Sequence, residues 1–582
     1  MLQPDARIWV EKTLRELSDR EKINQLFQTT LTHWDQRIPQ QTLVDRVRFN
    51  QAGGAFMAGR PWKQLRDLAR QATEGQKVPV IFSGDSECGP NTPAEGVAFG
   101  SAMALGAIAD LQEACTLAYE VGRVAALQCR ACGVRWSFAP VADLNFNPDN
   151  PITNIRSFGS DPERVGALVS AYLRGMQDHG LAATLKHFPG DGMDSRDQHI
   201  TTAVNPLTEE AWQSTYGKVF RAGLEAGPWS VMVGHLAWSA RSGRNPNTGL
   251  FLPATADSRI QIDLLRNEMG FTGVIVSDAI GMGGLAGHFK SEADLALANV
   301  LTGSDVVLFV ENLPAAADTF LKAMDRGELT RERLDASVRR ILELKAKVGL
   351  TPPAPVLPDE SASAAAFANR HEHTVRQVAE KSVTLIQDRN RLFPIKLPRG
   401  SKILVFDLPR DVSDLGKLAV VDAASNTDPG VQPTLGSNPV HSRPKAALAE
   451  ELEKGGYVVQ WVENLSDYER AVSCCDAVLY VFRNGPMAGR NSGRISYNAI
   501  QSLDLVRIFS HFPCYFLSLG SPYVAWEIPV LPNLICTYAG HDAAQRAAAS
   551  ALLGRIPFAG ILPVHLPEDS GFSQVCGPLS GL

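Results

Sequence analysis

TGVIVSDAI, residues 272–280, contains the apolar run GVIVSD, which ends at Asp278. The glycine-rich IGMGG at 280–284 follows it. A short apolar run bounded by turn residues predicts a buried strand. Segments with helical spacing separate it from six similar runs, and such alternation is typical of a parallel sheet. Seven strands fit a (β/α)₈ barrel with one weakly marked strand better than a doubly wound sheet. The other six runs are GGAFMAG at 53–59, VPVIFSGD at 78–85, VRWSFAPVAD at 134–143, AATLKHFPG at 182–190, WSVMVGH at 229–235 and SDVVLFV at 304–310.

A second domain is predicted beyond the barrel. TPPAPVLPDESASAAA at 351–366 is rich in Pro, Ser and Ala and is typical of a linker. It separates a barrel domain at 1–350 from an α/β sandwich domain at 367–582, which starts with a helical segment around 367–386. A polar, turn-rich stretch at 422–444 predicts a long surface loop. The strands expected in this domain are KILVFDLP at 402–409, YVVQWVE at 457–463, AVLYVFR at 477–483, CYFLSLG at 514–520, LICTYAG at 534–540 and ILPVHL at 561–566.

Composition excludes several classes of protein. The chain has 582 residues, 45% hydrophobic and 20% charged, as in ordinary globular domains. Its 56 Lys and Arg against 62 Asp and Glu give a charge of -6, which argues against nucleic acid or an anionic membrane as partner. The N-terminus lacks the apolar core of a signal peptide, and the longest uncharged stretch, 508–526, contains prolines unsuited to a membrane span. Nine scattered cysteines favour free thiols, and hence a cytoplasmic protein.

Ionisable residues gather at the carboxyl ends of the predicted strands. Asp85 ends one run, Lys186 and His187 lie near the end of another, and His235 and Asp278 end two more. Each of these residues alone is compatible with a helix cap, but barrel enzymes place their active sites at this edge. Asp278 stands out because a carboxylate at the end of an apolar strand suits a nucleophile.

The segment GDGMDSRDQHI at 190–200 holds three aspartates and a histidine: Asp191, Asp194, Asp197 and His199. These side chains could in principle bind a divalent metal, but the spacing is not that of an EF-hand and no second carboxylate-rich loop completes a cage. We therefore expect no metal. The alternative is that Asp197 orients the imidazole of His199 and makes it a general acid/base.

Several ordered motifs together carry a resemblance to a known family. They are Lys186-His187-Phe188-Pro189-Gly190, Asp-x-His at 197–199, Ser-Asp at 277–278, EKINQLF at 21–27, NPDNPITNIRSFGSDPERV at 147–165 and the segment 537–567. With these motifs the chain resembles glycoside hydrolase family 3, and specifically the two-domain bacterial members of its N-acetyl-β-glucosaminidase branch. It departs from them where Cys88-Gly89-Pro90 follows Glu87, and where Gly-Asp-Gly at 190–192 replaces the common Gly-His-Gly.

The resemblance implies a role for individual positions. The family's nucleophile falls on Asp278, and the acid/base of this branch falls on His199, assisted by Asp197. No cofactor is implied. The family's contacts to sugar hydroxyls fall on Asp85, Arg156, Lys186 and His187.

The function implied is a retaining, exo-acting β-N-acetylhexosaminidase for cell-wall or chitin-derived fragments, as a monomer or homodimer. A family 3 β-glucosidase is the closest alternative, although its acid is usually a glutamate of the second domain. Phosphorolysis is another, because an imidazole disfavours an approaching phosphate less than a carboxylate does. From a different class, Lys186 at a strand end could be the Schiff-base lysine of an aldolase.

Overall fold

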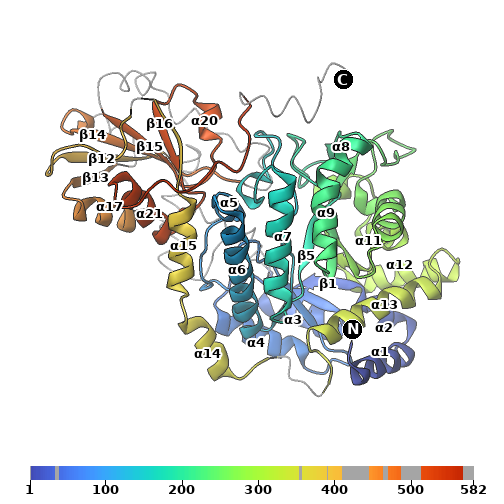
Figure 1. Ribbon diagram of the computed structural model, residues 1–582. Helices are drawn as coiled ribbons and strands as arrows, with labels where there is room; N and C mark the ends of the chain where they lie inside the picture. Colours follow the sequence, from blue (N-terminus) through green and yellow to red (C-terminus); the bar gives the residue numbers. More distant parts are fainter. Residues whose placement is uncertain are drawn as a thin grey trace.

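The N-terminal half of the chain forms a parallel barrel (Figure 1). The computed structural model describes residues 2–32, 38–352, 357–389, 391–408, 445–462, 470–486 and 513–567. The strands follow the order β4-β3-β2-β1-β10-β9-β7-β5. Parallel bridges from Trp136 to Ala182 and from Val141 to Lys186 link the two ends of this order. The barrel strands are β1 (Phe27–Thr30), β2 (Gly54–Phe56), β3 (Ile81–Gly84), β4 (Val134–Ser137), β5 (Thr184–Phe188), β7 (Ser230–Val233), β9 (Val274–Ala279) and β10 (Val306–Leu308).

The predicted barrel is therefore confirmed, and the weakly marked strand is β1. Its sequence FQTT contains only one strongly apolar residue, so hydrophobic pattern alone did not reveal it. The whole strand is nonetheless buried, because it pairs with β2 on one side and β10 on the other. A two-stranded parallel sheet lies outside the barrel and consists of β6 (Ala203–Asn205) and β8 (Leu236–Trp238).

Helices surround the barrel, and α6, α7 and α9 lie side by side along one flank (Figure 1). Side chains cap several of them: Asp110 accepts a hydrogen bond at the start of α6, and Asp161 does so at the start of α7. The helices of this half are α1 (Pro4–Glu16), α2 (Asp19–Gln25), α3 (Gln40–Phe49), α4 (Trp62–Thr73), α5 (Ala102–Gly106), α6 (Leu111–Ala131), η1 (Asn154–Arg156), α7 (Pro162–Gln177), α8 (Glu209–Ser214), α9 (Tyr216–Glu225), η2 (Ala254–Ala256), η3 (Arg259–Glu268), α10 (Gly283–Ala286), α11 (Glu292–Thr302), α12 (Leu313–Asp325) and α13 (Arg331–Lys347).

The C-terminal half contains a separate sheet of order β11-β16-β15-β14-β12-β13, in which only the β11–β16 pair is antiparallel. An α/β domain thus follows the barrel, as expected. The stretch 422–444 lies outside the described residues. The elements are α14 (Glu360–Ala368), α15 (Glu372–Ser382), β11 (Thr384–Asp388), β12 (Lys402–Leu408), α17 (Lys445–Lys454), β13 (Val458–Val462), β14 (Ala477–Phe482), β15 (Cys514–Ser518), α20 (Val524–Glu527), β16 (Asn533–Cys536) and α21 (Asp542–Leu552).

Two expectations for this half need correction. The segment 561–566 is not a strand: Pro563 has no N–H to donate, and the backbone instead bonds to barrel loops, with Ile561 N donating to Ala107 O and Pro563 O accepting from Ser160 N. The expected helical segment around 367–386 is also interrupted. Helix α15 ends at Ser382, and the following residues form β11 at the sheet edge.

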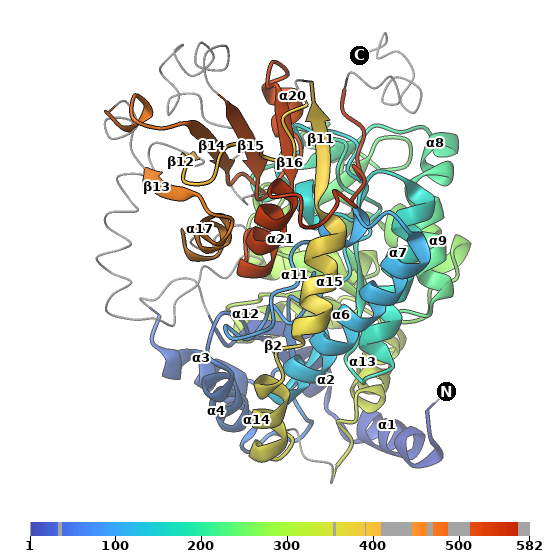
Figure 2. The same cartoon turned by 60° about the vertical axis from the view of Figure 1, so that its left-hand side comes forward.

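Helices α15 and α14 run down one flank of the barrel, with α15 next to the C-terminal sheet and α14 farther from it (Figure 1). Helix α14 begins inside the segment expected to be a linker and packs against α6. Its Phe367 ring also stacks on the ring of Trp62, in α4, with 5.2 Å between the ring centroids. Helix α15 contacts α5 and α6, and Figure 2 shows it passing beside α6 toward α21. Among the described residues, no helix is both long and apolar enough to cross a membrane.

A buried ion cluster fastens α13 and η3 to the barrel. Asp305, which is fully buried just before β10, accepts hydrogen bonds from Arg266, Arg333, Arg340 and Ser337. It also accepts the backbone N–H of β9 at 3.0 Å. Removing this carboxylate would leave buried guanidinium groups without their counter-charge.

We expect Asp305→Ala to lower the free energy of unfolding by about 3–5 kcal/mol, the usual cost of breaking a buried ion pair. Asp318→Ala is the control, since the Asp318–Arg20 pair is solvent-exposed and should contribute at most ~1 kcal/mol. Denaturant titration of both variants measures the difference. Equal losses in the two variants would contradict a structural role for the Asp305 cluster.

Candidate active site

The predicted site residues come together at the carboxyl end of the barrel. Lys186 and His187 belong to β5, Asp278 belongs to β9, and Asp85 directly follows β3. Asp278 Oδ2 lies 3.9 Å from His187 Nε2, and Lys186 Nζ lies 3.1 Å from Asp85 Oδ1. This is the barrel edge at which catalytic residues are expected.

Glu87 links Arg156, Lys186 and Asp85 into one ion cluster. Its carboxylate lies 2.7 Å from Lys186 Nζ and accepts two hydrogen bonds from Arg156, at 2.7 and 2.8 Å. Burial opposes ionisation of Glu87, but Arg156 and Lys186 more than offset it and hold its pKa well below the usual range. Glu87 has no role in the sequence-based prediction, although its position two residues after Asp85 is a signal that could have found it.

The charge state of Lys186 bears on the aldolase alternative. Burial favours a neutral amine, but the carboxylates of Asp85 and Glu87 outweigh it and raise the pKa of Lys186 above its ordinary value. Burial in turn raises the pKa of Asp85, because the attraction of Lys186 is partly cancelled by the charge of Glu87. A protonated lysine between two carboxylates is a poor Schiff-base nucleophile, so this geometry argues against an aldolase.

Asp143 orients His187 from behind. The carboxylate accepts from His187 Nδ1 at 2.7 Å and from the His187 backbone N–H at 3.1 Å. The other ring nitrogen of His187, Nε2, is thereby directed toward Asp278. Asp143 was not predicted as a site residue. It nonetheless ends the strand-like run at 134–143, just as the predicted site residues Asp85 and Asp278 lie at the ends of other runs.

Asp278 is set up as an anion. Its side chain is 15% exposed, and its Oδ1 accepts the backbone N–H of Ala279 at 2.7 Å. Burial disfavours the charge, but His187, His235 and His199 together more than offset it, and the pKa of Asp278 lies below the ordinary value.

The loop that carries Asp197 and His199 begins at a glycine pair. Gly190 and Gly192 have φ of 119° and 110°, and a Cβ at Gly192 would lie 1.9 Å from the Leu144 carbonyl oxygen. Only glycine fits there without strain. At the other end of the loop, His199 Nδ1 lies 2.7 Å from Oδ1 of the fully buried Asp197.

The two remaining aspartates of this loop have structural partners. Asp191 accepts from Asn150 and from the Gly192 N–H, while Asp194 accepts the Val204 N–H and pairs with Arg196. Their oxygens thus stabilise the loop. Burial and the charge of Asp143 raise the pKa of Asp191 to about 6, against the opposing effect of His187.

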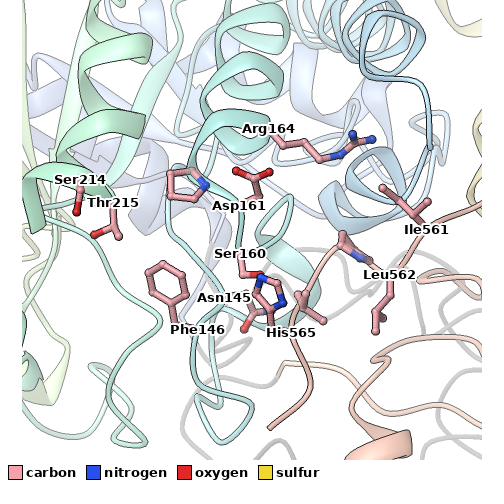
Figure 3. Close-up of a pocket in the computed structure, with 13 residues that line it drawn as sticks. Asn145, Phe146, Ser160, Asp161, Arg164, Ser214, Thr215, Ile561, Leu562 and His565 are labelled. Atoms are coloured by element: carbon pink, nitrogen blue, oxygen red, sulfur yellow. The ribbon is translucent and has the colours of Figure 1, made fainter. Parts of the chain in front are cut away.

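A cavity of about 480 Å³ lies between the barrel flank and the segment 561–565. Figure 3 shows the side chains that line it. Its barrel side includes Phe146, Asp161 and Thr215. None of its thirteen lining residues belongs to the cluster around Asp278. The cavity is therefore distinct from the candidate active site.

Comparison with known proteins agrees with this geometry. Residues 18–344 match the family model described as the glycosyl hydrolase family 3 N terminal domain. A β-N-acetylglucosaminidase/β-glucosidase of Cellulomonas fimi is 32% identical over 97% of this chain and 96% of its own length. The chain belongs to glycoside hydrolase family 3.

Solved structures support the same family. A β-glucoside phosphorylase, BglX, bound to 2FGlc, superposes with a TM-score of 0.83, with 26% identity and 97% of both chains covered. A family 3 β-N-acetylglucosaminidase from Paenibacillus superposes with a TM-score of 0.76, with 26% identity over 94% of this chain and 99% of its own. The protein is thus a family 3 enzyme that acts on carbohydrate substrates.

We expect Asp278→Asn to keep the fold, because the change is isosteric, and to reduce turnover of every glycoside to below about 1% of wild type, because an amide cannot attack the anomeric carbon. Initial rates on p-nitrophenyl glycosides measure this. Residual activity of several per cent would refute a nucleophilic role. Mass spectrometry after reaction with a fluoroglycosyl donor should find the label on the Asp278 peptide.

Proposed function

We propose that this enzyme is a retaining, exo-acting β-N-acetylglucosaminidase that cleaves terminal β-linked N-acetylhexosamine from cell-wall or chitin-derived fragments. The observation that carries the proposal is the His199–Asp197 pair, whose loop is bonded through the His199 carbonyl to the Gly283 N–H at 2.8 Å, five residues after Asp278. A nucleophilic carboxylate and a separate proton donor are the two groups that retaining glycosidases need.

The division of labour follows from the contacts. Asp278 is ionised and attacks the anomeric carbon, forming a glycosyl-enzyme intermediate. The bond between Asp197 and His199 Nδ1 leaves Nε2 as the nitrogen that gives its proton to the departing oxygen. The same nitrogen then takes a proton from the attacking water. No cofactor takes part in these steps.

Binding of the terminal sugar is assigned to four side chains: Asp85, Arg156, Lys186 and His187. Hydrogen bonds within their cluster already fix them, so that the sugar hydroxyls meet donors and acceptors at set positions. Such pre-organisation lowers the cost of orienting the sugar for attack.

Free thiols support a cytoplasmic location. The eight cysteines that the structure describes form no disulfide, and Cys129 and Cys132 are both buried. Persistent reduced thiols are typical of a reducing compartment.

We expect a preference for N-acetylglucosamine over glucose, because the Asp-x-His loop resembles the branch that acts on 2-acetamido sugars. The value of kcat/KM for p-nitrophenyl N-acetyl-β-glucosaminide should exceed that for the β-glucoside by at least about tenfold. The Cellulomonas relative is named for both activities, so both substrates belong in the assay. A preference for glucoside would instead favour the β-glucosidase alternative.

Phosphate is a second candidate acceptor. An imidazole base does not repel an approaching phosphate dianion as a carboxylate base would. The likeness to a β-glucoside phosphorylase over 97% of the chain supports including this reaction. Hydrolysis and phosphorolysis are distinguished by measuring turnover with and without inorganic phosphate. Chromatography detects the N-acetylglucosamine 1-phosphate that phosphorolysis forms. Hydrolysis predicts the free sugar in both conditions.

We expect His199→Ala to reduce kcat/KM on poor leaving groups by a factor on the order of 10²–10⁴, the usual contribution of general acid catalysis. Activated aryl glycosides should lose much less, because a phenol of low pKa leaves without a proton. Asp197→Ala should give a milder form of the same pattern, since the imidazole remains but loses its orienting partner. Rates over a series of aryl leaving groups provide the measurement.

External azide provides a further check on His199→Ala. Azide needs no base assistance, so it should partly restore turnover of activated substrates by intercepting the glycosyl-enzyme. Equal losses for all leaving groups, with no azide effect, would make His199 a structural residue.

A further inference from the structure

Gln198 lies between the two residues of the proposed acid/base pair, and its side chain is almost completely buried. Its Nε2 donates to Asp191 Oδ2 at 3.1 Å, and its Oε1 accepts the His235 backbone N–H at 2.9 Å. Its own carbonyl accepts the Gly284 N–H at 3.0 Å. One residue therefore connects the loop to its own beginning, to the end of β7 and to α10.

The first of these connections continues to the sugar-contact cluster. The Asp191 backbone N–H donates to Asp143 Oδ1 at 2.8 Å, and Asp143 is the carboxylate that holds His187. Asp191 itself is only 2% exposed. Gln198 thus stands at one end of a buried chain of hydrogen bonds that reaches the imidazole beside Asp278.

The second connection leads to the nucleophile from the opposite side. His235 Nε2 lies 2.8 Å from the Ala279 carbonyl oxygen, and the Ala279 N–H donates to Asp278 Oδ1 at 2.7 Å. In addition, the Gly283 N–H donates to the His199 carbonyl at 2.8 Å. The loop that carries His199 is therefore bonded on both sides to elements that also fix Asp278.

We propose that Gln198 and Asp191 form a positioning pair that holds the His199 imidazole in register with Asp278 during proton transfer. This inference rests on the proposed acid/base role of His199. Neither residue needs to touch substrate. Their effect is on the placement of the loop that starts at the Gly-Asp-Gly turn, and an error of about 1 Å in a catalytic group can cost about 100-fold in rate.

Position on the loop explains why these contacts matter for proton transfer in particular. Asp278 sits on a strand that is paired with a strand on each side, so its place depends much less on Gln198. His199 lies on a loop rather than on a strand, and it follows Gln198 directly. Loosening the loop should therefore affect the step that needs a proton far more than the attack by Asp278.

The test uses Gln198→Leu, which keeps much of the side-chain volume but removes both hydrogen bonds. We expect kcat/KM to fall on the order of 10–100-fold for glycosides with poor leaving groups and by less than about threefold for activated ones. Inhibition by a sugar that fills only the terminal subsite should be unchanged. Gln198→Asn is a second variant, polar but too short to reach both partners, and it should give the same pattern.

Gln128→Leu is the matched control. Gln128 is also fully buried and also makes one hydrogen bond as donor and one as acceptor, to Ala366 and Val97. A general packing defect should lower the melting temperature of both variants alike. Only Gln198→Leu should show losses that depend on the leaving group.

A double-mutant cycle with Asp191→Asn tests the pair itself. If the two residues act through one contact, the losses on poor leaving groups should not add, and the double variant should resemble the worse single variant. Additive losses, uniform losses over all leaving groups, or no loss in Gln198→Leu would each overturn the inference. If His199→Ala itself shows no dependence on the leaving group, the proposed function fails instead.

Discussion

The rest of the site depends on the ion pairs that the Lys186 ammonium makes with the carboxylates of Asp85 and Glu87. The Lys186 side chain is only 4% exposed. A lone buried charge of this kind would be strongly unfavourable, so the lysine requires both acids. Glu87 in turn is held by two hydrogen bonds from Arg156. The segments that supply these groups are thereby held together at hydrogen-bond distance.

A second buried acid, Asp143, connects these contacts to Asp278 through His187. Asp143 binds His187 through both its ring and its backbone, and the ring lies 3.9 Å from Asp278. The same carboxylate receives the backbone N–H of Asp191, at the start of the loop that carries His199. Asp143, which is only 1% exposed, thus bonds both to the imidazole beside Asp278 and to the start of the His199 loop.

Much of this could be predicted from the sequence, because strand-end residues follow directly from hydrophobic pattern. Asp278 and Lys186 are examples. The contacts between side chains could not, since Glu87 and Arg156 are 69 residues apart and nothing local in either residue predicts their ion pair. Polar β1 was missed because tertiary pairing, rather than side-chain character, makes it a strand. The error at 561–566 has the opposite cause: an apolar run packed on barrel loops instead of joining a sheet.

The two halves of the site are supported by different parts of the protein. Three of the hydrogen bonds that join the second domain to the barrel fall on the segments after β3 and β4: Tyr523 to Asn145, Ile561 to Ala107, and Pro563 to Ser160. Those segments also carry Asp85 and Arg156, two of the four residues proposed to contact the sugar. The His199 loop, by contrast, takes its described hydrogen bonds from the barrel. The second domain therefore supports the segments that hold Asp85 and Arg156, whereas the described hydrogen bonds of the loop that carries the proposed proton donor come from the barrel.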